Sequence, residues 1–293
     1  MTNGANMKIA VVAPSCTLKR EAAEQVIALA AGRGDCELVI HPQCFMVDGH
    51  FAGPDDARLA ALREAMADPS VDAVWFARGG YGSNRIAEAA LVDLPPAAGD
   101  KLYFGYSDAG FLHAGFHKAG LDVVWGPMPN DVLRDGGEAA VTRSLDWIVR
   151  RDASTLEPGL DGSAMAFNLT VLSNLLGTPL EPDFDGVELL IEDVGEHLYR
   201  IDRSMFHVTA SPAIRKVRRL RLGRVNDILP NDPVFAGDEV SVVEDWCRRS
   251  GIAFGGRADI GHDSRNRVVP FPRKIAERPS GRALQWSPLW ALS

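Results

Sequence analysis

Residues 101–110 read Lys-Leu-Tyr-Phe-Gly-Tyr-Ser-Asp-Ala-Gly, where a short apolar run meets the start of an amphipathic segment. This pattern predicts a strand that ends at Gly105, a sharp turn that carries Ser107, and a helix after it. A serine on such a turn exposes its hydroxyl at a helix N-terminus, where free backbone N–H groups favour negative charge. An acyl-transfer nucleophile has these requirements. The alternative is that Ser107 only caps the helix, a common role of serine.

The first half of the chain alternates predicted strands and helices. We expect strands over 9–13, 37–41, 71–76, 102–105 and 123–125, and helices that include 23–30 and 55–66. This alternation implies parallel βαβ units, and hence an α/β, Rossmann-like sheet with helices on both faces. Ligands bind beyond the carboxyl ends of the strands in such sheets. Both Gly79-Gly80 and Ser107 fall at such ends.

The second half of the chain has a different pattern of apolar residues. Short apolar runs over 187–191 and 217–222, with helices over 168–176 and 242–249, predict a smaller, mainly β region. The chain has 293 residues, more than the roughly 100–200 of one domain. We therefore predict a Rossmann-like domain over 1–151, a polar linker over 152–163 and a mixed, β-rich domain over 164–293. The tail after Lys274 shows little periodicity.

The composition is that of an ordinary globular protein, with 46% hydrophobic and 24% charged residues. A formal net charge of -8 argues against a nucleic-acid partner, because phosphate binding depends on clustered Lys and Arg. The basic run over 215–221 alternates like the solvated face of a strand. No signal peptide is recognisable, and no apolar stretch approaches the about 20 residues that cross a bilayer. We therefore expect no membrane partner.

The chain has four cysteines, at positions 16, 36, 44 and 247. They lack the spacing of metal ligands or of a disulfide framework, so we expect a reducing cytoplasm. Cys16 follows a predicted strand. It could be a reactive thiol, or it could simply be a small buried residue. His113 and His117 are one helical turn apart and could mimic a metal pair, but no third ligand matches them. The sequence thus predicts neither a metal nor a cofactor.

The segment Arg78-Gly-Gly-Tyr-Gly82 follows the third predicted strand. Adjacent glycines let backbone N–H groups approach a ligand closely, as a phosphate cradle or an oxyanion hole requires. The segment is not followed by the Lys-Ser/Thr of a Walker loop, and its glycine spacing differs from the dinucleotide fingerprint. A nicotinamide-dependent enzyme is therefore only a remote alternative. A plain tight turn is the other interpretation.

Acids and a histidine mark two further segments. The apolar run over 189–191 ends in two acids, of which Glu192 is the first, and Glu196 lies just beyond. A carboxylate at a strand end can orient a histidine, although acids exposed in a turn give the same pattern. His262 follows a glycine in a predicted loop, where an accessible imidazole is free to act as a base.

Together these segments resemble the LD-carboxypeptidase family of serine peptidases, which includes murein tetrapeptide carboxypeptidases and microcin C self-immunity peptidases. The resemblance covers about residues 8–273, and its motifs occur in the family's order. They are Ala-Pro-Ser at 13–15, Arg-Gly-Gly-Tyr-Gly at 78–82, Gly-Tyr-Ser-Asp at 105–108, Gly-Pro-Met at 126–128, Asn-Leu-Thr-Val-Leu at 168–172, Glu-Asp-Val-Gly-Glu at 192–196, Tyr-Arg-Ile-Asp-Arg at 199–203 and Gly-His at 261–262.

The resemblance implies a Ser-Glu-His triad that is completed across the domain junction. Ser107 matches the family's nucleophile and His262 its general base. Glu192 best matches the orienting carboxylate, and Glu196 stays an alternative because the register of the strand end is open. The family's members are commonly homodimers, so we expect a homodimer.

The triad mechanism also requires an oxyanion hole. We expect it from the backbone N–H groups of Asp108, which follows the nucleophile, and of Gly80. Arg78, Arg85 and Arg203 are candidates, by chemistry alone, for holding the free carboxylate of a peptide substrate.

The function implied by the resemblance is a cytoplasmic serine carboxypeptidase. It would hydrolyse an L,D peptide bond and release the terminal D-alanine of murein tetrapeptides during cell-wall recycling. One alternative is a microcin-immunity-like peptidase that cleaves an amide in a peptidyl or aminoacyl nucleotide. The other is a non-catalytic α/β ligand-binding protein with a relic site.

Two departures from the family pattern bear on the substrate. Ala166-Phe167 precede Asn168, where the family usually carries glycines, and could reshape the pocket wall. After His262 the family's Pro-Ile/Leu-Gly is replaced by Val-Pro-Phe-Pro at 269–272. Neither change touches the residues matched to the triad.

Overall fold

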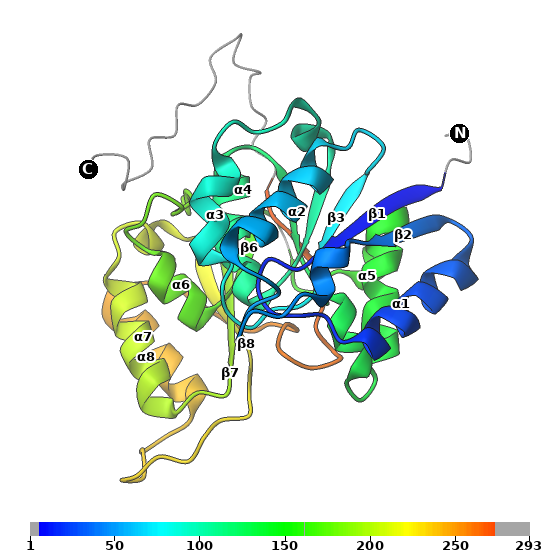
Figure 1. Ribbon diagram of the computed structural model, residues 1–293. Coiled ribbons are helices and arrows are strands. Elements are labelled where there is room, and N and C mark those ends of the chain that lie inside the picture. The colour runs from blue at the N-terminus through cyan, green and yellow to red at the C-terminus, as the bar shows by residue number, and fades with distance from the viewer. Residues whose placement is uncertain (1–5, 161, 273–293) are drawn as a thin grey trace.

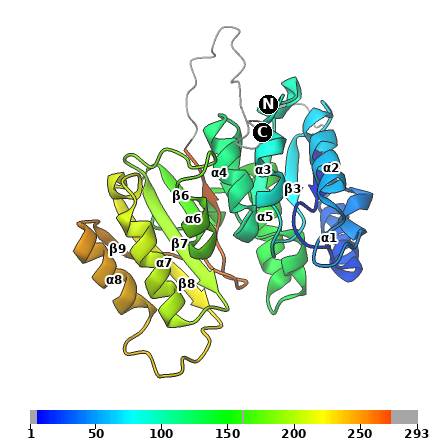
Figure 2. The same cartoon turned by 60° about the vertical axis from the view of Figure 1, so that its left-hand side comes forward.

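The computed structural model describes residues 6–160 and 162–272, which form two sheets with helices packed on them (Figure 1). The strand order is β10-β5-β4-β3-β1-β2 in the first sheet and β6-β7-β8-β9 in the second. In both views the second sheet lies to the left with α7 and α8, and the first lies to the right with α1 (Figures 1 and 2). The α/β class and the parallel first sheet are confirmed. The tail after Lys274 lies outside the described residues.

The first sheet is the predicted doubly wound sheet. Its parallel strands are β1 (Met7–Val12), β2 (Cys36–Ile40), β3 (Ala73–Phe76), β4 (Leu102–Gly105) and β5 (Asp122–Trp125). Its helices are α1 (Arg20–Arg33), α2 (Asp55–Ala67), α3 (Asn84–Leu91), α4 (Gly110–Lys118) and α5 (Gly137–Arg150). The late strand β10 (Val269–Pro270) pairs antiparallel with β5. The strand order reverses at β1 and β3, and ligands bind at such a point in sheets of this kind.

Alternation along the strands covers both faces of this sheet. Ile9 and Val11 pack with the apolar residues of α1 and α5, whereas Ala10 and Val12 pack with those of α2, α3 and α4. Successive side chains of a strand point to opposite faces, so a continuous apolar run is what a sheet covered on both sides needs.

The second sheet is also parallel, with strands β6 (Ala164–Asn168), β7 (Glu188–Val194), β8 (Arg219–Asn226) and β9 (Phe254–Arg257). Parallel neighbours need crossover connections, which α6 (Leu169–Leu175), α7 (Leu198–Ala210) and α8 (Glu239–Ser250) supply. This region therefore carries more helix than the mainly β pattern of the sequence indicated.

Short 3₁₀ helices lie at Pro42–Phe45, Pro96–Asp100, Ser107–Ala109, Pro129–Leu133, Ala153–Thr155 and Ile214–Lys216. Within the described ranges, none of the helices combines the length and the apolar character that a membrane crossing demands.

The basic run over 215–221 does not form a solvated strand face, so that prediction is wrong. Arg221 is buried on β8 and forms ion pairs with Glu157 at 2.7 Å and Glu188 at 3.1 Å. Arg218 and Arg219 each lie 2.9 Å from the second carboxylate oxygen of Glu188. The buried charges of Arg221 and Glu188 need such partners, because burial removes their hydration.

The apolar core is continuous between the two sheets. It includes α2, α3 and α4 on one side and β6, β7 and α7 on the other. Ala166 and Phe167 are fully buried in β6, and the Phe167 ring packs against Phe184 and Phe271. The Ala166-Phe167 departure from the family pattern thus fills the core, and neither residue lines the cavities beside Ser107.

Candidate active site

Ser107 lies on a strained turn between β4 and α4. Its φ is 61°, in the left-handed region that residues with a side chain rarely adopt, at a cost on the order of 1–3 kcal/mol. Its side chain caps no helix, because Tyr106 is the N-cap of the 3₁₀ turn Ser107–Ala109. The hydroxyl lies instead 2.9 Å from His262 Nε2. The turn therefore aims this serine at a histidine 155 residues further along the chain.

The other ring nitrogen of His262 contacts a buried carboxylate. Nδ1 lies 2.5 Å from Glu192 Oε2, and the Glu192 side chain on β7 is fully buried. Glu196 lies beyond the end of the strand, where it pairs with Arg200 at 3.5 Å. The structure thus brings Glu192, and not Glu196, to the histidine.

The Glu192 carboxylate raises the pKa of His262. Burial by itself lowers the pKa of His262, but the negative charge of Glu192 and its hydrogen bond to the ring outweigh burial. The net effect raises the pKa of His262 above its ordinary value of 6.5. The imidazole is thereby oriented, and its protonated form is stabilised.

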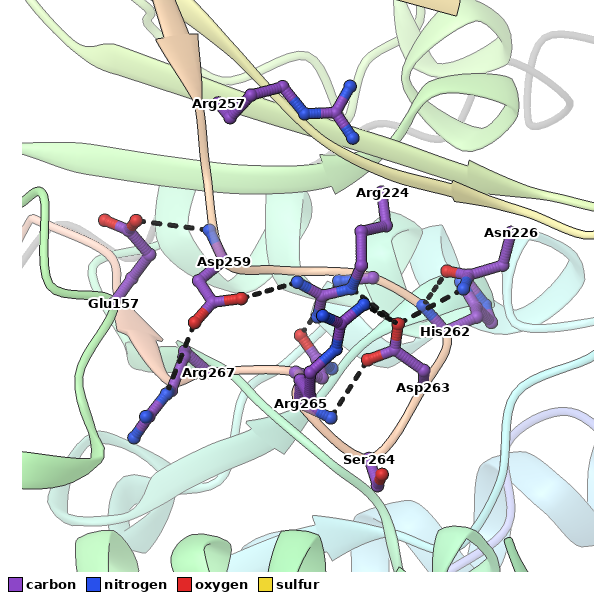
Figure 3. A network of polar contacts seen from close by, with 12 residues as sticks. Glu157, Arg224, Asn226, Arg257, Asp259, His262, Asp263, Ser264, Arg265 and Arg267 are labelled. Carbon is purple, nitrogen blue, oxygen red and sulfur yellow. Dashed lines mark hydrogen bonds and ion pairs between the residues drawn. The ribbon is translucent and has the colours of Figure 1, made fainter. Parts of the chain in front are cut away.

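Ion pairs and hydrogen bonds connect the loop that carries His262 to the end of β8 (Figure 3). Arg224 bridges Asp259 and Asp263, with a nitrogen–oxygen distance of 2.5 Å to each. The Asn226 side chain accepts a hydrogen bond from the backbone N–H of His262 at 2.8 Å and donates one to the Asp263 carboxylate at 3.2 Å. Sequence reasoning missed both positioning residues. The signal that could have found them is two polar residues, two positions apart, at the end of a predicted apolar strand.

The glycines after β3 lie directly against Ser107. A Cβ atom on Gly79 would stand 2.9 Å from Ser107 Oγ, and one on Gly80 would overlap the sulfur of Cys16. Gly80 also has a φ of 108°, which L side chains rarely adopt. Cys16 is buried, with its sulfur 3.3 Å from His50 Nε2. Gly79 and Gly80 therefore let the backbone after β3 lie close to Ser107 and Cys16, and Gly80 also allows the positive φ of the turn.

Asp108 ties three loops together behind the serine. Its buried carboxylate accepts the Ser15 hydroxyl at 2.5 Å and the Ser83 backbone N–H at 2.8 Å. Burial raises the pKa of Asp108, and these hydrogen bonds oppose that rise. The loops after β1, β3 and β4 are therefore held in one fixed arrangement.

Comparison with known proteins agrees with this geometry. Residues 9–126 match the LD-carboxypeptidase N-terminal domain, and residues 161–276 match the LD-carboxypeptidase C-terminal domain. The chain belongs to the LD-carboxypeptidase family. The resemblance inferred from the motifs is thereby confirmed.

Curated relatives carry related names. A probable murein peptide carboxypeptidase of Bacillus subtilis is 32% identical over 244 residues, which cover 78% of this chain and 75% of the relative. A putative carboxypeptidase of Streptomyces coelicolor is 33% identical over 90% of this chain and 94% of its own length. The murein tetrapeptide carboxypeptidase of Pseudomonas aeruginosa is 26% identical over 95% of each chain.

Solved structures show the same fold. A muramoyltetrapeptide carboxypeptidase from Oxalobacter formigenes superposes with a TM-score of 0.72 at 23% identity, covering 89% of this chain and 92% of that one. The microcin C7 self immunity protein MccF superposes with a TM-score of 0.75 at 17% identity, covering 92% of each chain. At these identities the likeness concerns the fold.

In this member of the LD-carboxypeptidase family, Ser107 lines two cavities. The larger, of about 570 Å³, lies between α3, α4, α6 and the end of β7. The smaller, of about 280 Å³, is lined by Arg78, Arg134 and His262. Of the three arginines predicted to hold a substrate carboxylate, only Arg78 lines either cavity. Arg85 pairs with Asp55, and Arg203 stacks on a tyrosine ring of α7.

The histidine pair on α4 belongs to the core. His113 is buried against Phe76 and Phe271, and burial lowers its pKa to about 3. His117 Nε2 lies 2.9 Å from the backbone oxygen of Pro272. Over residues 6–160 and 162–272, no group of three His, Cys, Asp or Glu side chains is placed to hold a metal ion.

Proposed function

We propose that this chain is a serine carboxypeptidase that hydrolyses an L,D peptide bond and releases the terminal D-alanine of murein tetrapeptides. The observation that carries the proposal is the continuous series of short contacts from Ser107 through His262 to Glu192. The names of the murein peptide carboxypeptidase relatives support the substrate class.

The reaction follows from the order of these three groups. His262 Nε2 accepts the hydroxyl proton as Ser107 Oγ attacks the scissile carbonyl carbon, and Glu192 stabilises the resulting imidazolium. The same proton passes to the leaving amine nitrogen as the peptide bond breaks. Water then attacks the acyl-enzyme, His262 takes its proton, and the carboxylate product leaves as Ser107 Oγ is reprotonated.

The developing oxyanion needs donors beside Ser107. We assign the backbone N–H groups of Gly80 and Asp108 to this role, because one lies in the glycine segment against the serine and the other follows it at the start of the 3₁₀ turn. Removal of one such donor typically lowers the rate by about 10²–10³.

The leaving residue has a free carboxylate that needs a cation. Arg78 lines the smaller cavity with Ser107 and is the residue we assign to it. Arg134 lines the same cavity, but its guanidinium pairs with Asp131 at 3.1 Å and donates to the backbone oxygen of His262. Arg134 therefore acts on the histidine loop rather than on the substrate.

The test is mass spectrometry of the purified protein after incubation with a murein tetrapeptide, alongside the Ser107→Ala variant. We expect loss of one D-alanine with the intact serine and none with the variant. No release, with Ser107 still labelled by a serine-directed phosphonate, would mean a hydrolase of another amide, such as a peptidyl or aminoacyl nucleotide. No release and no labelling would mean a binding protein.

The cytoplasmic location, the homodimer and the domain boundaries near residues 151 and 164 stay predictions. Size-exclusion chromatography with light scattering measures the second of these directly.

A further inference from the structure

His262 has contacts with both sheets, and the two sets of contacts do different things. Glu192, Arg224 and Asn226, which hold the histidine or its loop, lie on strands of the second sheet. Ser107 follows β4 of the first sheet. Contacts with the second sheet alone therefore do not fix the distance between the serine and the histidine. That distance also depends on what the first sheet places against His262.

Tyr106, the residue directly before the nucleophile, supplies one such contact. Its side chain is buried, and its ring centre lies 4.9 Å from the centre of the His262 ring. The same ring packs in a T-shaped arrangement against Trp125 of β5, with 5.3 Å between the ring centres. Because protein interiors are close-packed, the Tyr106 ring limits how far the imidazole can turn.

The Tyr106 hydroxyl is itself fixed by a carboxylate. It donates to Asp131 Oδ1 at 3.0 Å, and Asp131 is buried. The other carboxylate oxygen of Asp131 accepts a hydrogen bond from the backbone N–H of Met128 at 2.8 Å. Both oxygens of this carboxylate thus have donors, as a buried charge requires.

Asp131 is also connected to the backbone of the histidine. Arg134 Nε lies 3.1 Å from Asp131 Oδ1, and the Arg134 guanidinium donates to the backbone oxygen of His262. One carboxylate therefore orients two groups, the tyrosine beside the imidazole ring and the arginine on the backbone of the same histidine. Movement of either group is transmitted to the other through Asp131.

We propose that Tyr106 is a positioning residue that holds the His262 imidazole against the nucleophile. It acts together with Arg134, and Asp131 couples the two. The proposal rests on the proposed function in one respect, that Ser107 is the nucleophile and His262 its base. The contact at stake is the 2.9 Å between His262 Nε2 and Ser107 Oγ. A misplacement of about 1 Å can lower a rate about 10²-fold, so loss of one supporting contact should slow the chemical step and leave substrate affinity unchanged.

The experiment compares Tyr106→Phe with Tyr103→Phe. Both tyrosines are buried, and each hydroxyl donates one hydrogen bond of 3.0 Å, that of Tyr103 to the backbone oxygen of Ala98. Each substitution removes one hydroxyl and one hydrogen bond, so the urea midpoints of the two variants should fall by similar amounts. The Tyr106 ring contacts His262, whereas the Tyr103 ring packs against Phe116.

The first readout is the rate at which a serine-directed phosphonate labels Ser107, followed by mass spectrometry of the intact protein. This rate depends on the serine–histidine pair and requires no peptide substrate. We expect labelling to be about 10-fold slower in Tyr106→Phe than in the wild type, and within about twofold of the wild type in Tyr103→Phe. With the murein tetrapeptide as substrate, the same loss should appear in kcat, with KM nearly unchanged.

A double-mutant cycle tests the coupling through Asp131. Arg134→Met alone should also slow the labelling of Ser107. Its combination with Tyr106→Phe should slow labelling by less than the product of the two single effects, because both variants disturb one network. Its combination with Tyr103→Phe should equal the product, because those two sites share no partner.

Labelling of Tyr106→Phe at the wild-type rate, an equal loss in Tyr103→Phe, or a rise in KM at constant kcat would overturn the proposal. Single effects of Tyr106→Phe and Arg134→Met that simply multiply would also overturn it. Release of D-alanine by the wild type is scored separately. Labelling that depends on Tyr106, without such release, would refute the proposed reaction and keep the positioning role. A wild type that shows neither labelling nor release would overturn both.

Discussion

Ser107 combines a left-handed backbone with a hydroxyl in hydrogen-bond contact with a buried histidine–carboxylate pair. The strain is local, and it is held by the packing of the loops after β1, β3 and β4 around Asp108. Strain of this kind persists only where the surroundings over-determine it, and it is concentrated at functional sites.

Glu192→Gln removes the charge that raises the pKa of His262. In the proposed mechanism the neutral imidazole is the base, so activity is lost as the pH falls through that pKa. Without the charge, burial dominates and the pKa falls. We therefore expect the acid limb of the kcat/KM profile to move to lower pH, and the maximal rate to drop by about 10²–10⁴-fold. Tetrapeptide hydrolysis measured across pH checks this.

Glu196→Gln is the matched comparison for that profile. Its carboxylate pairs with Arg200 and makes no contact with His262. A shift of the acid limb in Glu196→Gln, with none in Glu192→Gln, would show that the orienting acid is misassigned.

Gly79→Ala tests the close approach of the glycine segment. The added methyl would stand 2.9 Å from Ser107 Oγ, so the hydroxyl must move away from His262. We expect kcat to fall about 10²-fold, as for a misplacement of about 1 Å, with little change in the urea midpoint. Gly99→Ala is the control, because open space surrounds that position. Equal kinetics for the two variants would contradict the contact.

At the scale of elements, the end of β8 positions the histidine loop. Residues two apart on a strand point the same way, so Arg224 and Asn226 both face the loop that contains Asp259 and Asp263 (Figure 3). One guanidinium bridges two carboxylates, which a lysine ammonium cannot do with the same geometry.

Arg224→Met should therefore act on the chemical step through the position of His262. We expect kcat to fall about 10- to 100-fold with KM nearly unchanged, and Arg224→Lys to recover part of the loss. Steady-state kinetics of both variants measure the effect. A rise in KM at constant kcat would instead place Arg224 in substrate binding.

At the scale of the whole molecule, one apolar core joins both sheets, and β10 returns from the end of the described chain to pair with β5. Elements that pack in the same apolar core are expected to unfold together, because each loses its packing partners when the other unfolds. We expect one cooperative unfolding transition in urea, with amide exchange of β1 and β7 converging on the same midpoint. Exchange measured by mass spectrometry tests this, and two separate midpoints would mean that the sheets unfold independently.

Local signals in the sequence predicted much of the fold. The run over 102–105 and the strand–helix alternation before residue 150 gave the first sheet, because buried strands have continuous apolar runs and helices have their own period. The second sheet was harder. Its strands are short, and Asp193 and Arg221 look solvated in sequence although both are buried against partners that are distant in the chain.

The sequence by itself determined the α/β class, the serine turn, and the short list of acids, histidines and arginines that could accompany it. Only the tertiary structure decided among them. Glu192 rather than Glu196 meets His262 because the register of β7 within the second sheet faces a loop 70 residues away. Arg78 rather than Arg85 or Arg203 lines the site because the loop after β3 lies against Ser107. Such choices depend on which side chains are brought together across the sheets, and contacts between residues far apart in the chain leave no local pattern in sequence.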